Sequence, residues 1–328
     1  MKRLSFALSL VLLLTLCTTA LAAPLVIANT PKCVGIAWWD RMEVGNKRFS
    51  EATGAEVYQV GPAGASDPAV QLATVEDAIA SGVNAITVIP SSPETLEPAL
   101  KKAMDQGIVV ISHEAAMMTN IHYDIEAFDN YAYGAHMMDV LAAEMGGKGG
   151  YCIMVGALTM TSHQQWAEGA IKRQEEAYPD MYQVCERVES AAQGGSQEGS
   201  YLVAKEVIAS YPDVKGFIGC DMINPPGIAM AVEEAGKAGT IAVTGTCLVS
   251  VSREYLEKGT IKTISFWDPA DAGQAMCALA QKVIAGEAIE NGLNLGVPGF
   301  ENCTVEGKII TGSAWVDVTV ANMADYDF

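Results

Sequence analysis

The feature that most constrains this chain is a repeated alternation of apolar runs with amphipathic stretches that end at glycine. The runs at 84–89 and 108–112 are rich in β-branched residues, and the stretch at 94–106 between them ends at Gly107. Continuous apolar strands separated by amphipathic helices are typical of parallel strand–helix–strand units, in which helices cover both faces of the sheet. The sequence therefore predicts an α/β protein.

The same alternation begins again in the second half of the chain. Strand-like runs at 151–156, 182–188, 214–219 and 240–245 are separated by further helical patterns. A chain of 328 residues is also longer than one hydrophobic core usually serves. We therefore predict two doubly wound lobes, each built on a parallel sheet.

The first residues have the pattern of a secretory signal peptide. Two basic residues precede an apolar stretch at 4–16, and small residues follow at Ala20 and Ala22. The apolar stretch is shorter than the ~20 residues that a membrane-spanning helix needs. Cys17 lacks the preceding small residue that a lipoprotein signal requires. A signal peptide over 1–22 is therefore predicted, with cleavage after its last residue or the next one, and export to the periplasm.

The charge and the cysteines exclude several kinds of partner. With 20 Lys and Arg against 39 Asp and Glu, the net charge is −19, which repels nucleic acid and anionic membrane surfaces. Neither nucleic acid binding nor stable membrane insertion is expected. The cysteines show no metal-binding or scaffold spacing. The sequence leaves the disulfide status of the following residues open: Cys33, Cys152, Cys185, Cys220, Cys247, Cys277 and Cys303.

Catalytic motifs are missing from the sequence. There is no G-x-S-x-G nucleophile turn and no phosphate-binding glycine loop. The segment that starts at His113 resembles a zinc-protease motif, but Met117 stands where the second histidine is required. The sequence predicts a binding protein that is not an enzyme and needs no metal or cofactor; a secreted hydrolase is the remote alternative.

Polar and aromatic residues follow the predicted strands, and they are the candidate site. In doubly wound sheets, ligands bind at the carboxyl ends of the strands, where loops and helix N-termini converge. The candidate ligand-binding residues are Lys32, Trp38, Trp39, Glu114, Ser162, His163, Gln164, Asp221, Met222, Asn224, Thr246, Trp267 and Asp268.

Several of these residues lie in segments that resemble a known family. The segments are "PKCVGIAWWD" (31–40), "GVNAITVIPSSPETLEPALKKAMDQGI" (82–108), "TSHQQW" (161–166), "GTIKTISFWDPADAG" (259–273) and the terminal "YDF" (326–328). Together they resemble the type I periplasmic sugar-binding proteins of ABC importers, in the branch of the autoinducer-2 (Lsr-type) and rhamnose-type receptors. The resemblance implies a monomer whose two lobes close on a small ligand and deliver it to a permease with its ATPase.

The resemblance also implies a role for the two adjacent tryptophans. In the ribose-type members, a double aromatic at the start of the first helix holds the sugar. Trp38 and Trp39 precede a helix expected over 41–52, and their indole rings offer a flat apolar face with N–H donors at the edge. Two alternatives stay open: both rings pack the helix against its sheet, or only one of them faces the cleft.

The identity of the ligand is predicted from departures within the family pattern. The positions at which autoinducer-2 receptors contact their ligand correspond to Lys32, Glu114, Ser162, His163, Cys220 and Met222. Glu114 replaces an aspartate, and the Ser162-His163 pair replaces Asp-Gln. A carboxylate bound to a sugar hydroxyl contributes roughly 1.5–3 kcal/mol, so these changes matter. A rhamnose-like or pentose-like monosaccharide is therefore favoured, with autoinducer-2 as the alternative.

The lobe boundaries are predicted from the places where the pattern restarts or changes. Three crossings are expected near 127–130, 266–269 and 294–299, together forming a three-segment hinge. A hairpin is expected to turn at Glu306-Gly307. The resulting lobes are 23–128 plus 268–294 for the N-terminal lobe, and 129–267 plus 295–328 for the C-terminal lobe.

Overall fold

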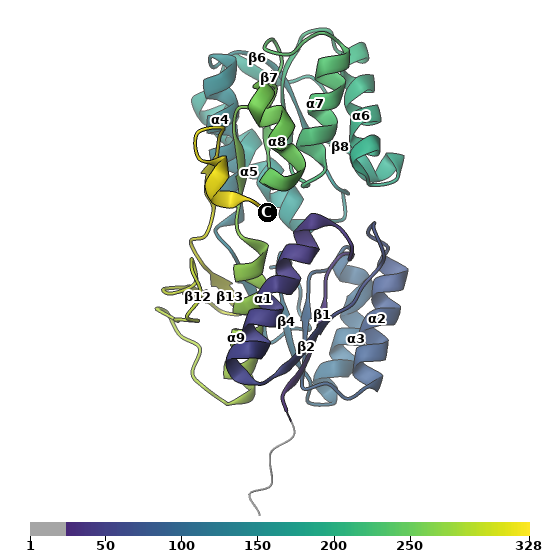
Figure 1. Ribbon diagram of the computed structural model, residues 1–328, viewed down its shortest axis with the longest axis vertical. Coiled ribbons are helices and arrows are strands. Elements are labelled where there is room, and N and C mark those ends of the chain that lie inside the picture. The colour runs from purple at the N-terminus through teal and green to yellow at the C-terminus, as the bar shows by residue number, and fades with distance from the viewer. Residues whose placement is uncertain (1–23) are drawn as a thin grey trace, which may run out of the picture.

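The computed structural model describes residues 24–328 as two lobes stacked along the long axis of the molecule (Figure 1). The predicted signal peptide lies outside the described residues. Each lobe contains a sheet of mainly parallel strands with helices on both faces, so the predicted α/β fold with two doubly wound lobes is confirmed. No helix within the described range is long and apolar enough to cross a membrane.

The first lobe is built on a seven-stranded sheet in the order β12-β13-β5-β4-β3-β1-β2. Its parallel strands are β1 (Val26–Thr30), β2 (Glu56–Gln59), β3 (Ala85–Val88), β4 (Val109–Ser112) and β5 (Tyr123–Glu126). All of them except β2, at the edge of the sheet, are largely buried, as expected for a sheet covered on both faces. The helices that cover the sheet are α1 (Ala37–Thr53), α2 (Pro68–Ala80), α3 (Pro93–Asp105) and α9 (Pro269–Ile284).

The second lobe is built on a sheet in the order β10-β9-β6-β7, with β8 pairing to β6 beyond the end of β7. Its strands are β6 (Gly149–Val155), β7 (Met181–Gln183), β8 (Val188–Glu189), β9 (Val214–Gly219) and β10 (Ala242–Gly245). Its helices are α4 (Asn130–Met145), α5 (Thr161–Ala177), α6 (Gln197–Ser210), α7 (Asn224–Glu234) and α8 (Val249–Lys258). The single strand predicted over 182–188 is two short strands, because the chain bends at 184–186 between them.

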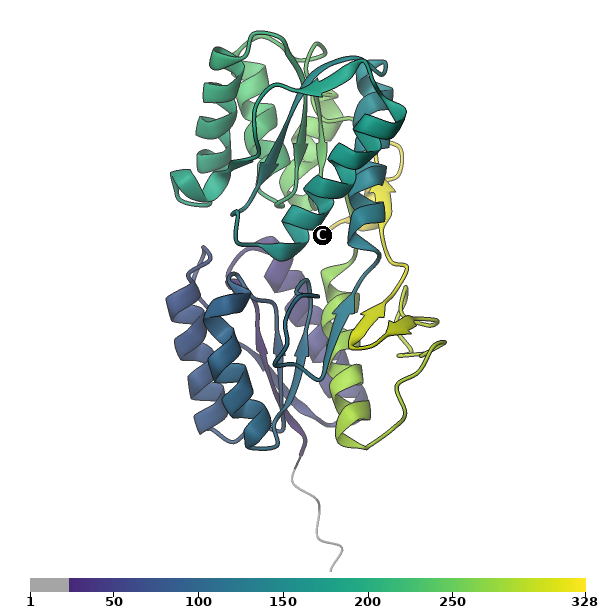
Figure 2. The ribbon, with the colours of Figure 1, turned by 180° about the vertical axis from the view of Figure 1, so that it is seen from behind.

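The predicted hairpin is present, but it belongs to the other lobe. Strands β12 (Thr304–Glu306) and β13 (Ile309–Thr311) pair with each other, and β13 continues the first sheet parallel to β5. Ile310 lies opposite Ile125 and is fully buried, so the hairpin covers an otherwise open apolar edge. Figure 2 shows this hairpin at the edge of the lower lobe. The assignment of all of 295–328 to the C-terminal lobe was therefore wrong.

The chain passes between the lobes at three places. Two of them follow β5 and β11 (Ile264–Phe266), at 127–129 and 267–268. The third is at 312–315, between β13 and β14 (Val316–Val318), and not at 294–299. Strand β14 pairs antiparallel with β11, which continues beside the second sheet through a bridge to the end of β10.

The ring of Phe128, on the first crossing, packs against one aromatic ring from each of the other two crossings. It lies 5.1 Å from that of Trp267 and 5.5 Å from that of Trp315. Both contacts are edge-to-face, which is a favoured arrangement for aromatic pairs. The three crossings therefore share one packed cluster.

Candidate ligand-binding site

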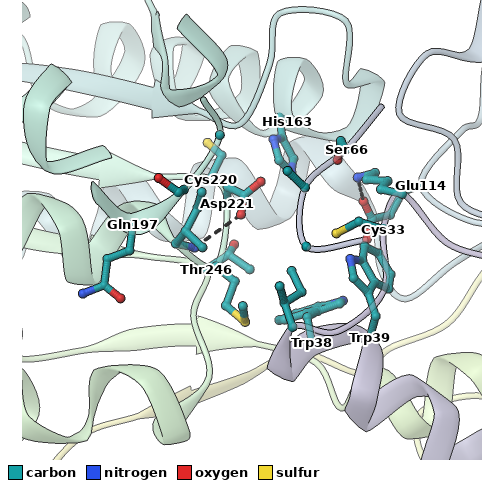
Figure 3. Close-up of a pocket in the computed structure, with 18 of the residues that line it drawn as sticks. Cys33, Trp38, Trp39, Ser66, Glu114, His163, Gln197, Cys220, Asp221 and Thr246 are labelled. Carbon is teal, nitrogen blue, oxygen red and sulfur yellow. Dashed lines mark hydrogen bonds and ion pairs between the residues drawn. The ribbon is translucent and has the colours of Figure 1, made fainter. Parts of the chain in front are cut away.

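A cavity of about 210 Å³ lies between the lobes, at the carboxyl ends of both sheets (Figure 3). The first lobe contributes the end of β1, the start of α1 and the loops after β2 and β4. The second lobe contributes the start of α5 and the loops after β8, β9 and β10, and Trp267 lies on the second crossing. The lining residues are Lys32, Cys33, Ile36, Trp38, Trp39, Gly64, Ala65, Ser66, Glu114, His163, Trp166, Gly195, Ser196, Gln197, Cys220, Asp221, Met222, Ile223, Thr246 and Trp267.

Most of the residues that the sequence nominated line this one cavity. They are Lys32, Trp38, Trp39, Glu114, His163, Asp221, Met222, Thr246 and Trp267. The fold therefore brings together residues that follow different strands and are more than two hundred positions apart in the sequence. The cavity is the candidate binding site.

Four nominated residues do not line the cavity. Ser162 lies behind it and donates a hydrogen bond to Glu114. The Asn224 side chain makes its hydrogen bonds within the second lobe: it accepts from the Asp221 backbone N–H and donates to two buried serine hydroxyls. Asp268 caps the start of α9 and binds Arg41 through both of its oxygens. The side-chain nitrogen of Gln164 is buried without a hydrogen-bond partner within the described residues.

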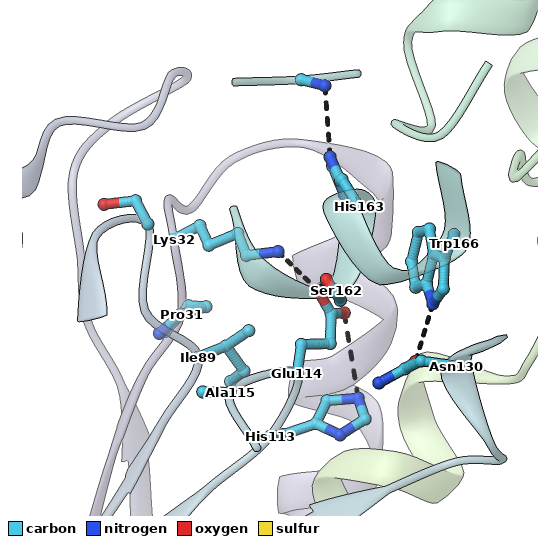
Figure 4. Close-up of polar contacts among 12 residues, drawn as sticks. Pro31, Lys32, Ile89, His113, Glu114, Ala115, Asn130, Ser162, His163 and Trp166 are labelled. Atoms are coloured by element: carbon cyan, nitrogen blue, oxygen red, sulfur yellow. Dashed lines mark hydrogen bonds and ion pairs between the residues drawn. The ribbon is translucent and has the colours of Figure 1, made fainter. Parts of the chain in front are cut away.

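The central polar feature is a buried ion pair between Lys32 and Glu114 (Figure 4). Both side chains are almost completely buried, although they come from loops after different strands. The backbone of Glu114 has a φ of 58°, and no other non-glycine residue of 24–328 has a positive φ. Such strained conformations persist where the surrounding structure imposes them, often at binding sites.

Glu114 is ionised in this environment. Burial alone would raise its pKa, but the nearby Lys32, His113 and His163 and the hydrogen bond from Lys32 outweigh burial and lower the pKa to about 2. One carboxylate oxygen accepts from Lys32 of the first lobe and, at 3.1 Å, from the Ser162 hydroxyl of the second lobe. Glu114 therefore connects the two lobes through one oxygen.

His163 is neutral and is oriented by the backbone. Burial, followed by the charge of Lys32, lowers its pKa to about 3. Its Nδ1 accepts a hydrogen bond of 3.1 Å from the Gly156 N–H, so the single proton of the neutral ring is on Nε2. The imidazole lies at the cavity wall and is available as a hydrogen-bond donor.

Tryptophan rings form the apolar part of the wall. The edge-to-face pair of Trp38 and Trp267 has a centroid distance of 4.7 Å, and Trp166 lies 5.7 Å from Trp267. The buried indole N–H of Trp267 has no hydrogen-bond partner among the described residues. Trp39 also lines the cavity and is 5% exposed, like Trp38. The wall therefore combines flat apolar surface with an unused donor.

Asp221 faces the tryptophans from the second lobe (Figure 3). Burial raises its pKa, and the charge of Lys32 offsets this only in part. The carboxylate accepts from the Ile223 N–H at 3.3 Å and makes no ion pair within residues 24–328. It therefore offers an acceptor to a ligand hydroxyl.

Two glycine-containing loops in the lining were missed from the sequence. They are 64–66, after β2, and 195–197, after β8. Both follow strand ends, so the same rule would have found them. The loop after β2 contains only small residues around Ser66, and the end of β8 could not be recognised while 182–188 was predicted as a single strand.

Comparison with known proteins shows the family. A family model for the periplasmic binding protein domain matches residues 27–288, which is most of the described chain. This protein belongs to that family. Its two lobes and the cavity between them agree with this assignment.

Two curated relatives are similar over most of their length. One is a D-ribose/D-allose-binding protein of Pseudomonas aeruginosa, 26% identical over 85% of this chain and 91% of the relative. The other is a D-allose-binding periplasmic protein of Escherichia coli, 27% identical over 79% of this chain and 84% of the relative.

Two solved structures share the fold. One is LsrB from Clostridium saccharobutylicum in complex with AI-2, with a TM-score of 0.81 and 20% identity over 92% of this chain and 100% of that one. The other is an ABC transporter solute binding protein from Clostridium phytofermentas with bound L-rhamnose, with a TM-score of 0.83 and 19% identity over 93% and 99% of the two chains.

Proposed function

We propose that this protein is an exported solute-binding protein of an ABC importer. It captures one neutral monosaccharide, rhamnose-like or pentose-like, between its lobes and delivers it to a permease with its ATPase. The two curated relatives, named for binding ribose and allose, support a sugar ligand. The observation that carries the proposal is the buried interlobe cavity, whose wall combines tryptophan rings with a self-neutralised ion pair.

The size of the cavity favours a single sugar ring. Pockets for drug-sized ligands typically occupy roughly 300–1,000 Å³, and this one has about 210 Å³. Micromolar binding needs about 8 kcal/mol. One aromatic stack and several hydrogen bonds to Glu114 and Asp221 are sufficient for that when both lobes exclude water.

The charges in the cavity favour a neutral ligand. Lys32 and Glu114 cancel each other, Asp221 adds a carboxyl group, and the lining contains no arginine. A sugar acid would place its carboxylate near these two carboxyl groups, without a free cation to bind it. Ile36 and Met222 add apolar surface beside the tryptophans, which suits a ligand with a methyl group.

Autoinducer-2 is the second candidate ligand. Lys32 fits the pattern of its receptors, and a structure in complex with AI-2 shares the fold. In this chain, however, Ser162 offers a hydroxyl where those receptors have a carboxylate, and it is already bound to Glu114.

Calorimetry on the exported protein, after a thermal-shift screen, tests the proposal. The panel contains L-rhamnose, L-lyxose (the same ring without the methyl group), D-ribose, a matched sugar acid and autoinducer-2. We expect micromolar or tighter binding of a neutral monosaccharide and none of the sugar acid. Binding of autoinducer-2 alone would favour the second candidate, and turnover of a model ester would favour a secreted hydrolase. Failure of every sugar would contradict the proposal.

A further inference from the structure

Two cysteines of the second lobe lie side by side outside the ligand cavity. Cys152 is fully buried on β6, and Cys185 is half-buried in the bend that follows β7. Their sulfur atoms are 3.6 Å apart, which is close enough for a hydrogen bond between the thiols. Among the seven cysteines of residues 24–328, no other two sulfurs make such a contact.

The backbone places the two cysteines on neighbouring segments of the sheet. Strands β6 and β7 pair in parallel, with Tyr151 opposite Gln183, and the next N–H, of Val184, donates to the Tyr151 carbonyl at 2.9 Å. Extending this register sets Val184 opposite Cys152, so Cys185 lies one residue further along, in the bend that follows the strand. The two sulfurs, 3.6 Å apart, need to approach by about 1.5 Å to reach the S–S distance of a disulfide.

The two thiols differ in reactivity. The hydrogen bond between the two thiols lowers the pKa of Cys185, whereas the same bond and burial raise the pKa of Cys152. The thiolate is the attacking species in disulfide exchange, and attack needs access to the oxidant. Cys185 has both the more acidic thiol and the more exposed position.

We propose that Cys152 and Cys185 are an oxidisable pair that closes to a disulfide. The Cys185 thiolate attacks one sulfur of an external disulfide, such as glutathione disulfide or a periplasmic oxidoreductase, and releases one thiol. Cys152 then loses its proton and attacks the Cys185 sulfur, which releases the second thiol. The protein loses two electrons and two protons, and the external disulfide is reduced to two thiols.

The bond would fix one wall of the ligand cavity. The segment after Cys185 forms β8, which pairs with β6, and leads through a short helix to the lining loop 195–197. A bond to Cys152 attaches the start of this segment to the centre of the sheet. The pairing does not depend on which ligand the cavity binds.

Thiol counting and peptide mapping of the purified full-length protein test the pair. The protein is equilibrated with glutathione disulfide or with a reductant, and free thiols are counted after denaturation. We expect oxidation to remove two thiols and to give one peptide pair linked through Cys152 and Cys185. Because the bond closes a loop of more than thirty residues, reduction should lower the Tm by about 5 °C or more.

Two variants separate this pair from the other cysteines. Cys185→Ser, at a half-buried position, should abolish both the thiol loss and the Tm difference. Cys277→Ser is the control, because this buried cysteine of α9 contacts Asn46 and no other cysteine, and it should leave both unchanged. Unchanged thiols in the oxidised wild type, or a glutathione adduct on Cys185 without the linked peptide, would overturn the pair. A linked peptide without a Tm difference would overturn the fixing of the segment.

Discussion

The two walls of the cavity are prepared for a ligand in different ways. In the first lobe, Lys32 and Glu114 neutralise each other before any ligand arrives. In the second lobe, Asp221 makes no ion pair within the described chain, and His163 lines the cavity with its proton on Nε2, because its Nδ1 is occupied by the Gly156 N–H. The charged groups of one wall therefore depend on each other, whereas the polar groups of the other remain available to a ligand.

This difference separates folding from binding. A buried charge whose partner is removed is strongly destabilising, so changes in the first wall should affect stability most. A buried donor or acceptor that is satisfied by a ligand should affect affinity and its pH dependence most. Four sets of substitutions test the distinction.

The largest effect is expected for Lys32→Met. It leaves the buried Glu114 carboxylate without its cation, and the free energy of unfolding should fall by about 3–5 kcal/mol. Urea denaturation at pH 7 measures this. The exposed pair of Lys47 and Glu43 is the matched control, and Lys47→Met should cost no more than about 0.5 kcal/mol.

A double variant shows whether the unpaired charge is the cause. Adding Glu114→Gln to Lys32→Met removes the charge, so most of the lost stability should return. If the double variant is as unstable as Lys32→Met alone, the loss comes from packing of the lysine side chain and the first wall is not organised by its ion pair.

The next effect concerns the tryptophan wall. If the rings hold the ligand, Trp38→Ala or Trp39→Ala should weaken binding by more than ~1.5 kcal/mol, which is over tenfold. The buried Phe49 lies further along α1 and does not line the cavity. Phe49→Ala should therefore lower stability without a comparable loss of affinity. Calorimetry with the ligand found in the screen decides this, and near-wild-type affinity in both tryptophan variants would place the site elsewhere.

The strand–helix alternation predicted the fold because each parallel strand is an apolar run that can be recognised locally. The lobe of the β12–β13 hairpin could not be predicted, because pairing of Ile310 with Ile125 is a contact between distant segments. The start of α1 was placed too late for another reason. The Trp39 and Asp40 N–H groups both bind the Ile36 carbonyl, and Ile36 carries no capping side chain that would mark a helix start.

The candidate site could be predicted in part, because most residues that line the cavity follow the end of a strand. Polar residues at strand ends also cap helices and fix loops, as Asp268 and Asn224 do. Residue type and spacing do not distinguish these roles from ligand binding. The unusual backbone of Glu114 and its contact with Ser162 depend on how the lobes meet, which no local pattern contains.

A smaller effect is expected from the pH dependence of His163. Its pKa falls from an ordinary value of 6.5 to about 3 on folding, so the unfolded chain binds a proton that the folded chain does not. The contribution of the neutral His163 to stability is therefore complete above pH 6.5 and is lost as the pH falls towards 3. When the pH is lowered from 7 to 5, the free energy of unfolding of His163→Gln should fall by up to about 2 kcal/mol less than that of the wild type.

His136 provides a control of opposite sign. Hydrogen bonding to Asp317 raises the pKa of His136, so its contribution is complete below pH 6.5 and is lost as the pH rises. His136→Gln should therefore lose more stability than the wild type between pH 7 and pH 5. Denaturant unfolding at both pH values measures the two variants, and equal slopes would mean that neither histidine titrates differently on folding.

The smallest effect is expected at the contact between the walls. Ser162→Ala removes the hydroxyl that binds Glu114 across the cleft but leaves the Lys32 ion pair, so the closed form should lose about 0.5–1.5 kcal/mol. Ligand affinity should fall by roughly two- to tenfold at the same fold stability. Thr159→Val is the control, because the exposed Thr159 hydroxyl also bonds across the cleft, to the Ser91 carbonyl, and its removal should lower ligand affinity less.

Solution scattering completes the test of the contact between the walls. Ligand should reduce the radius of gyration of the wild type, because such hinges move lobes as rigid bodies. Ser162→Ala should need more ligand for the same reduction. An unchanged radius of gyration in ligand-saturated wild type would contradict hinge closure. A larger loss of ligand affinity in Thr159→Val than in Ser162→Ala would mean that the contact with Glu114 is not the one that stabilises the closed form.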